Sequence, residues 1–523
     1  MKWILVLTAV AGAGTMIVEL AAVRLLAPWF GASSAVWTNV IGVVLLALSI
    51  GYLVGARLAV GPRPLAKLSA VLVVAGSFIL WLPAVTAPLA EFLVPRGVSL
   101  AESPGLFTWG SLAASCLLFG PAAGLLACVG PLATEVLHRR GISHAGAAGG
   151  RVLFASTLGS LVGTFATTYL LVPRLGLSAT FVGAGLLVLL SGLVLLVRTR
   201  KGVSMLLLAA GAFAISYSRT ELPGPSGEEV VLATTDSSYQ FLRVVEGGEA
   251  EGLYRLLQVN EGLDSFQSVW TPELGLLGAG YYYDYFVLPL WWQRSSDANV
   301  FVIGLGAGTT WRVLAGAAPS ETSLRMVGAE IDPKVIEFGH AYFDLPREDP
   351  ALEVLAGWDG RAAMTTLQTP CELIILDAYA NQSEIPAHLS SIEFFGEVRE
   401  RLTDGGTLAV NIGGFGFGDP VVQALARTVA LAFDERVLLV QVPNARNIML
   451  YAVRDGEAPE PGTLHESLGN LPVEIANLVA PIQIPGCSRW ILPVGEPLTD
   501  DLNPLDRLQA MSLARGVEGW LEQ

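Results

Sequence analysis

The sequence predicts a multi-pass α-helical membrane domain followed by an α/β domain with a parallel, doubly wound sheet. Three observations indicate this fold class. Residues 1–218 contain 13 Lys and Arg, 4 Glu and no Asp, and long apolar runs fill this part. Residues 219–523 contain 18 basic and 42 acidic residues, a composition typical of a domain in water. Within this second part, short apolar runs alternate with helix-like segments, as in a parallel sheet covered by helices.

The net charge of the 523-residue chain is -15, and the acidic excess lies in the second part. An acidic surface repels phosphates, which argues against nucleic acid as a partner. The four cysteines do not form a disulfide framework, because Cys116 and Cys128 lie in apolar runs while Cys371 and Cys487 are far apart. This usage is typical of a reducing compartment.

Residues 1–218 are expected to form about seven transmembrane segments. A spanning helix needs about 20 mainly apolar residues. The apolar runs lie near residues 3–26, 37–60, 68–89, 106–137, 152–172, 177–197 and 203–217. The first run is too long, and too soon followed by the next, for a cleaved signal peptide. The fourth is long, and the last is short for a full crossing.

Basic residues mark the loops expected to face the cytoplasm. They follow the second, fourth and sixth runs, at Arg57, Arg63 and Lys67, at Arg139, Arg140 and Arg151, and at Arg198, Arg200 and Lys201. This pattern places the N-terminus inside, and seven full crossings would then place the second part outside. A nucleotide-using domain needs the cytoplasm, where its cofactor is made. We therefore expect an inner-membrane protein with a cytoplasmic soluble domain, in which the fourth or seventh run is not a simple crossing.

Two charged side chains, Glu19 and Arg24, lie within the first apolar run. Charges inside a membrane span are costly and mark functional positions by default. Pairing between helices, or Arg24 reaching the membrane interface, would explain them equally well. Small residues spaced along the runs, such as Gly159 and Gly163, indicate close helix packing.

The second part is expected to comprise a linker (219–227), a small β subdomain (228–285) and a Rossmann-like nucleotide-binding domain (286–523). The subdomain has short strand-like runs at 230–232, 241–246 and 254–260. An aromatic cluster at 281–285 leads into an expected helix at 286–292, and a further helix is expected at 391–402, capped by Ser390 or Ser391. The expected strands of the large sheet are 300–304, 324–331, 352–355, 373–376, 407–412, 437–442 and 447–453, the last two forming a hairpin.

A glycine turn joins the first of these strands to the next helix. It has glycine at 304, 306 and 308, and a helix-compatible segment starts at Thr309. Glycine lets the backbone approach a ligand closely, and the following helix N-terminus attracts anions. An acidic residue about 20 positions later usually holds a ribose hydroxyl, and here it is Glu330. Asp359 and Asp377 follow the third and fourth strands, so they should lie at the same edge of the sheet.

These motifs resemble those of the spermidine synthase (polyamine aminopropyltransferase) family, in particular its membrane-fused bacterial members, over nearly the whole chain. Residues 238–240 (SYQ) resemble the entry strand, and 302–310 (VIGLGAGTT) resemble the glycine loop. Residues 328–333 resemble the ribose-binding segment, and 376–395 the active-site loop and following helix. The resemblance implies a methyltransferase-type fold, no metal, and S-adenosylmethionine or decarboxylated S-adenosylmethionine as co-substrate. It also implies a nucleotide site made by Gln240, Gly304, Gly306, Gly308, Glu330, Asp359 and Asp377.

The chain departs from the family at two carboxylates. Ala307 stands where the family has the Asp that holds the aminopropyl amine, and Ala380 where it has the Asp that orients the acceptor amine and takes its proton. An amine nucleophile must lose a proton, so another group has to accept it. The candidates are Asp377, Tyr379, Glu384 and His388, with Asp284 of the aromatic cluster as a substitute contact to the acceptor.

The first hypothesis is therefore a membrane-bound transferase of polyamine-type metabolism that moves an aminopropyl or related group to an amine acceptor. Methyl transfer to a hydrophobic acceptor is a second hypothesis. A transporter or sensor with a nucleotide-binding domain is a third, favoured by Glu19 and Arg24. A dehydrogenase is disfavoured because the turn lacks the G-x-G-x-x-G spacing. The expected partners are the lipid bilayer and a small amine or hydrophobic acceptor, and a homodimer is left open.

Overall fold

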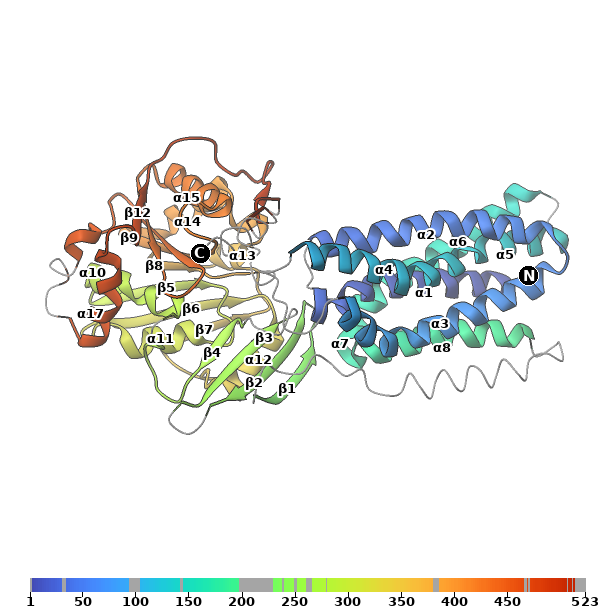
Figure 1. Cartoon of the computed structure of the whole chain (residues 1–523), viewed down its shortest axis with the longest axis horizontal. Helices are drawn as coiled ribbons and strands as arrows, with labels where there is room; N and C mark the ends of the chain where they lie inside the picture. The colour runs from blue at the N-terminus through green and yellow to red at the C-terminus, as the bar shows by residue number, and fades with distance from the viewer. Residues whose placement is uncertain are drawn as a thin grey trace.

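The computed structural model has two parts, an elongated helical bundle and an α/β domain at one end of it (Figure 1). The chain's N-terminus lies at the end of the bundle away from the α/β domain. The structure describes residues 2–30, 34–93, 104–141, 144–196, 229–237, 239–248, 252–259, 266–278, 280–379, 385–464, 468, 471–505, 507–509 and 511–512.

The helical bundle consists of helices packed side by side, most of them long and apolar. They are α1 (Lys2–Phe30), α2 (Ser34–Val60), α3 (Pro64–Leu93), α4 (Pro104–Ala127), α5 (Val129–Arg139), α6 (Ala145–Ala166), α7 (Val172–Leu175) and α8 (Leu177–Leu196). The described residues contain six helices long and apolar enough to cross a membrane, with α4 and α5 counted together. The expected seventh segment, 203–217, lies outside the described residues.

Glycines bring the helices of the bundle into close contact. A Cβ atom on Gly159 of α6 would lie 1.9 Å from the carbonyl oxygen of Ala9 in α1. A Cβ on Gly51 of α2 would lie 2.2 Å from the carbonyl oxygen of Gly124 in α4. Neither position can hold a side chain, so the small residues serve helix packing, as the sequence predicted.

The two ends of the bundle differ in charge. The Arg139 guanidinium donates to the carbonyl oxygen of Gly61, and that of Arg140 lies 4.9 Å from the centre of the Trp3 ring, so these residues share one end. This end is the one away from the α/β domain (Figure 1). It holds most of the basic residues of the described bundle: Lys2, Arg57, Arg63, Lys67, Arg139, Arg140 and Arg151.

The β subdomain is a four-stranded antiparallel sheet in the order β1-β2-β3-β4. Its strands are β1 (Val230–Asp236), β2 (Phe241–Gly247), β3 (Tyr254–Val259) and β4 (Ser268–Trp270). The first three overlap the expected strands. β4 was not predicted, because three residues are too few to form a pattern.

The large sheet has eight strands in the order β12-β10-β11-β9-β8-β5-β6-β7. The parallel strands are β5 (Asp297–Ile303), β6 (Ser323–Glu330), β7 (Leu352–Ala356), β8 (Cys371–Leu376) and β9 (Leu402–Gly413). The remaining strands are β10 (Val437–Gln441), β11 (Asn447–Val453) and β12 (Ser488–Ile491). Each pairs antiparallel with its neighbours: β11 with β9, β10 with β11, and β12 with β10. The order reverses at β5, between β8 and β6, and this is where such sheets bind ligands.

Helices cover both faces of the large sheet. Alternate β5 residues enter two different cores, with Val300 and Val302 on one side and Phe301 and Ile303 on the other. The covering helices are α10 (Leu288–Gln293), α11 (Thr309–Ala317), α12 (Pro333–Tyr342), α13 (Gly360–Met364), α14 (Ile392–Arg401), α15 (Pro420–Phe433) and α17 (Val473–Val479). One expectation needed correction: the helix expected at 286–292 is a 3-10 turn (Tyr282–Val287) followed by α10. Of the two expected caps of α14, Ser391 is the one observed, and its hydroxyl accepts the Phe394 N–H.

Candidate functional site

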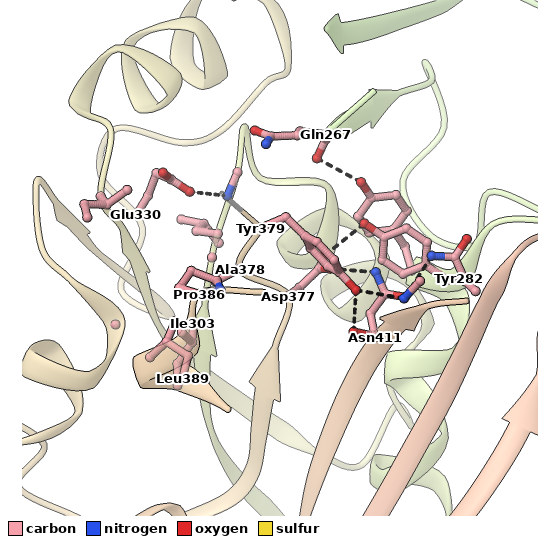
Figure 2. Close-up of a pocket in the computed structure, with 18 of the residues that line it drawn as sticks. Gln267, Tyr282, Ile303, Glu330, Asp377, Ala378, Tyr379, Pro386, Leu389 and Asn411 are labelled. Atoms are coloured by element: carbon pink, nitrogen blue, oxygen red, sulfur yellow. Dashed lines mark hydrogen bonds between the residues drawn. The ribbon is translucent and has the colours of Figure 1, made fainter. Parts of the chain in front are cut away.

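A cavity of about 640 Å³ lies at the carboxyl edge of the parallel strands. The glycine turn, the ends of β6, β8 and β9, the aromatic segment before α10 and the loop before α14 contribute to its walls (Figure 2). Trp37, from the first turn of α2, lines the same cavity. The site is therefore built by the α/β domain and bordered by the helical bundle.

The glycine turn adopts backbone angles that favour glycine at all three positions. The φ angles are 90° at Gly304, 58° at Gly306 and 100° at Gly308. Gly304 and Gly306 line the cavity, as expected of ligand contacts. Gly308 does not line it, and a Cβ there would lie 2.7 Å from Cδ1 of Leu345. The expectation that Gly308 contacts the nucleotide is corrected: it is the N-cap of α11 and lets that helix pack on Leu345.

Glu330, the last residue of β6, faces the cavity across from the glycine turn (Figure 2). One carboxylate oxygen accepts the Gly306 N–H at 3.0 Å, and the other accepts the Asp332 N–H at 3.0 Å. Burial raises the pKa of Glu330 to about 7, against the lowering effect of these two hydrogen bonds. Each oxygen keeps a further lone pair, which two adjacent hydroxyls of a ribose could engage.

Asp359 and His388 form a pair in the cavity wall. One Asp359 oxygen accepts the Ala362 N–H as the cap of α13, and the other lies 2.8 Å from Nε2 of His388. Burial opposes the charged form, but the hydrogen bonds from Ala362 and His388 outweigh it and lower the pKa of Asp359. His388 is thus engaged with the acid expected at the adenine.

Asp377 follows β8, lines the cavity and is held by two donors (Figure 2). The Asn411 amide donates to one oxygen at 2.9 Å, and the Tyr282 hydroxyl donates to the other at 3.1 Å. The amide oxygen of Asn411 in turn accepts from the Asn447 amide at 2.8 Å. Burial raises the pKa of Asp377 to about 7, and the negative charge of Glu330 adds to the rise. The result is a fixed carboxylate that exchanges its proton near neutral pH.

Comparison with curated proteins agrees with the predicted resemblance. The chain is 31% identical over 231 residues to a probable polyamine aminopropyl transferase of Bifidobacterium longum, covering 42% of this chain and 49% of that one. It is 25% identical over 165 residues to the polyamine aminopropyltransferase of Chromobacterium violaceum, covering 32% of this chain and 59% of that one. The chain is similar in sequence to polyamine aminopropyltransferases over part of its length. It spans about half the length of these relatives, and no family model matches it.

Solved structures extend the comparison. The probable spermidine synthase of Corynebacterium glutamicum is 18% identical, with a TM-score of 0.38, covering 49% of this chain and 89% of that one.

Among the curated proteins there is also a shorter match, over 123 residues at 31% identity. It is to the N-terminal histidine N-methyltransferase of Emericella nidulans and covers 23% of this chain and 21% of that one.

In the α/β domain, two of the side chains expected to be catalytic form hydrogen bonds with backbone groups of the protein. The Tyr379 hydroxyl donates to the carbonyl oxygen of Asn411 at 2.7 Å and accepts the Gly413 N–H at 3.1 Å (Figure 2). Asp284 lies outside the cavity lining, and its two oxygens accept the N–H groups of Leu277 and Gly278, each at 2.8 Å. The expectation that Asp284 contacts the acceptor is corrected, because its carboxylate holds the loop before the aromatic segment. Burial raises its pKa to about 6.

Of the two positions that depart from the family, only Ala307 belongs to the described residues. Ala307 is fully buried, and its N–H donates to the Ser268 hydroxyl at 2.8 Å. Ala380 and Glu384 lie outside the described residues.

Replacing Asp284 by asparagine is expected to lower stability and leave turnover within about 2-fold of the parent. An asparagine can accept only one of the two N–H groups, and a buried N–H without a partner costs about 1–3 kcal/mol. Thermal unfolding of the full-length protein in detergent measures the first effect, and steady-state transfer the second. Unchanged stability with a turnover reduced 10-fold or more would restore the catalytic assignment.

Several cavity residues were not among the predicted site residues. Asn411 could have been found, because it ends a strand at the same edge as Asp377. Tyr282 belongs to the aromatic cluster, in which only Asp284 was predicted as a site residue. Trp37 and Arg446 carry no local signal, since one lies in an apolar helix and the other in a hairpin turn.

A chain of hydrogen bonds joins the bundle to the part of the α/β domain that holds Glu330. The guanidinium of Arg24 in α1 donates to the carbonyl oxygen of Ser237 at 2.9 Å. The Ser237 hydroxyl donates to Asp332 at 2.6 Å and accepts the N–H of Gln240, which lines the cavity. The Asp332 N–H donates to Glu330. Arg24 therefore lies at the interface of the two parts, which removes its support for a transport path through the bundle.

Replacing Arg24 by methionine is expected to weaken the binding of an S-adenosyl ligand by about 5-fold, since the Ser237 loop loses a charge-assisted hydrogen bond. Calorimetry on the full-length protein measures this affinity. Arg174→Met, which removes an exposed basic side chain from α7, is the control. Equal losses in the two variants would contradict a role for the Ser237 contact.

Proposed function

We propose that this protein is a membrane-bound transferase that moves an aminopropyl or related group from an S-adenosyl co-substrate to an amine acceptor. The observation that carries the proposal is Asp377, a carboxylate of the cavity wall that Asn411 and Tyr282 hold by hydrogen bonds and whose pKa burial raises to about 7. It lies in the same cavity as the glycine turn and Glu330, which have the chemistry to hold a nucleoside. The curated relatives are described as polyamine aminopropyltransferases.

The cavity residues fit an S-adenosyl compound. Glu330 would accept the ribose hydroxyls, since its oxygens already have their N–H partners and retain lone pairs. Asp359 would accept the adenine amino group, and Gln240 would contact the nucleoside from the β subdomain. Gly304 and Gly306 leave room for the ligand next to the backbone.

The co-substrate supplies a carbon bonded to a positively charged sulfur, which leaves as a neutral thioether when a nitrogen attacks. Asp377 would hold the acceptor amine in line with that carbon and take its proton. Asn411 and Tyr282 keep the carboxylate in one orientation by hydrogen bonds to its two oxygens. Positioning of this kind, with proton removal by a base of pKa near the working pH, is sufficient for displacement at a sulfonium.

Binding of decarboxylated S-adenosylmethionine and of S-adenosylmethionine to the purified protein tests the proposal. We expect the decarboxylated form to bind at least 10-fold more tightly in calorimetry. Tighter binding of the intact form would favour the second hypothesis, methyl transfer. Binding of neither form would overturn the transferase proposal and favour the third hypothesis, a sensor or transporter.

One observation favours methyl transfer as the second candidate. Ala307 has no carboxylate that could bind the amine of an aminopropyl group, whereas the family Asp at this position would bind it. The match to an N-terminal histidine N-methyltransferase is compatible with this candidate. The calorimetric preference between the decarboxylated and the intact co-substrate separates the two candidates.

The location of the α/β domain offers an independent test. The proposal puts the bundle in the inner membrane and the α/β domain in the cytoplasm, where S-adenosyl compounds are made. The basic end of the bundle lies away from that domain, and the positive-inside rule would assign that end to the cytoplasm. Fusions to the C-terminus distinguish the two orientations. Fluorescence of a fused green fluorescent protein supports the proposal, whereas activity of a fused alkaline phosphatase would overturn the use of a cytoplasmic co-substrate.

A further inference from the structure

Arg446 lines the same cavity from the turn between β10 and β11. Its guanidinium carbon lies 5.5 Å from the centre of the Phe415 ring, which also lines the cavity. Its carbonyl oxygen accepts the Gly414 N–H at 2.9 Å, so the hairpin turn is tied to the segment that follows β9. The next residue, Asn447, belongs to the network that ends at Asp377. The guanidinium is therefore held at the β9 and β11 end of the cavity, beyond Asp377 from the nucleotide residues.

The other charged groups of the cavity have partners. Glu330 accepts two backbone N–H groups, Asp359 is paired with His388, and Asp377 accepts from two side chains. Arg446 makes no ion pair with any carboxylate in the described ranges of the chain, and its side chain remains accessible from the cavity. Desolvation lowers the pKa of Arg446, in the direction expected where no nearby anion offsets the loss of water.

We propose that Arg446 binds an anionic group, a carboxylate or phosphate, that the acceptor carries beside its nucleophilic amine. This inference rests on the proposed transfer function and specifies its acceptor. A guanidinium presents a planar fork of donors that matches the oxygens of a carboxylate or phosphate. An acceptor with only ammonium groups would bring like charge to Arg446, and this repulsion disfavours its binding.

Two sources supply an amine joined to an anion. One is a water-soluble amino acid, and the other is the headgroup of an aminophospholipid. Trp37 of the bundle lines the cavity, so a headgroup entering from the bundle side is compatible with its position. The chemistry at Arg446 is the same for both sources, and the experiment separates them.

The test compares putrescine with ornithine, which is putrescine with an added carboxylate on a terminal carbon, in the full-length protein with its preferred co-substrate. We expect kcat/KM for ornithine to exceed that for putrescine by about 10-fold or more. Arg446→Gln should lower the ornithine value by about 10- to 100-fold and change the putrescine value by less than about 3-fold. Arg446→Lys should recover part of the loss. Arg489→Gln is the matched control, because Arg489 lies 5.6 Å from the Phe417 ring but outside the cavity lining.

A lipid arm uses nanodiscs with and without phosphatidylethanolamine. Transfer to the lipid that Arg446→Gln abolishes supports the same inference with a headgroup as the source. A direct measurement, calorimetric binding of ornithine and of the nanodisc lipid in the presence of methylthioadenosine, needs no turnover. Arg446→Gln should lose that binding.

Two outcomes would overturn the inference while leaving the transferase intact. In the first, Arg446→Gln weakens binding of S-adenosylmethionine but not of its decarboxylated form, which would assign the anion to the co-substrate's own carboxylate. In the second, the wild-type protein binds co-substrate and Arg446→Gln changes neither acceptor binding nor acceptor preference. Failure of the wild-type protein to bind either co-substrate would instead mark the failure of the proposed function.

Discussion

Replacing Asp377 by asparagine is expected to lower the turnover number by about 10²- to 10⁴-fold, with co-substrate affinity changed much less. The carboxylate is held by Asn411 and Tyr282 in the wall of the cavity, where an acceptor amine would have to give up its proton. An asparagine there keeps the volume but cannot take up a proton. Single-turnover transfer and calorimetric affinity, measured on the same preparation, separate the chemical step from binding.

The pH dependence gives a second readout of the same group. The pKa of Asp377 is about 7, and the base must be ionised to act, so kcat/KM should rise as the pH increases through about 7. The Tyr282 hydrogen bond stabilises the ionised carboxylate, so Tyr282→Phe should move this rise to higher pH. A variant at Asp377 that keeps full turnover, or a Tyr282→Phe profile that stays in place, would exclude Asp377 as the base.

Replacing Glu330 by glutamine is expected to weaken co-substrate binding by about 10- to 100-fold, the value of a hydrogen bond to a charged acceptor. The carboxylate accepts the N–H groups of Gly306 and Asp332, so the glutamine amide would present a donor to a donor on one side. The variant therefore loses both the charge that the ribose hydroxyls would meet and the fixed shape of the glycine turn. Calorimetry with the full-length protein measures the affinity.

The affinity should also depend on pH. The pKa of Glu330 is about 7, so the carboxylate is ionised above that pH and protonated below it. Because two ribose hydroxyls need an ionised acceptor, co-substrate binding should tighten as the pH rises through about 7, and Glu330→Gln should remove this dependence. Glu337→Gln, on the exposed surface of α12, is the control. An unchanged affinity in Glu330→Gln would place the ribose elsewhere in the cavity.

The strands of the large sheet could be predicted where each is an apolar run closed by turn residues. The seven expected strands, including the antiparallel hairpin of β10 and β11, all overlap observed ones. β12 was missed because its sequence, SRWI, has no clear alternation, and it becomes a strand only by pairing with β10.

In the candidate site, too, residues placed by a local pattern were predicted, and residues placed by packing were not. Glu330 and Asp377 were predicted to lie together because the carboxyl ends of parallel strands meet at one edge, and both line one cavity. Asp284 and Gly308 have suitable chemistry but do not line the cavity. The direction of Asp284 is set by the amides of Leu277 and Gly278, and these contacts come from the packing of a loop that has no periodic pattern.

The sequence by itself determined the apolar bundle, the alternation of strands and helices, and the placing of Glu330, Asp359 and Asp377 at one cavity. Each of these depends on composition, periodicity or spacing within one or two consecutive elements. Only the tertiary structure decided that Trp37 borders the cavity, that Arg24 bonds to the loop beside Asp332, and that Arg446 lies in the same cavity as Asp377. The physical reason is that these contacts join segments far apart in the chain, so they depend on how whole elements pack and not on any local pattern.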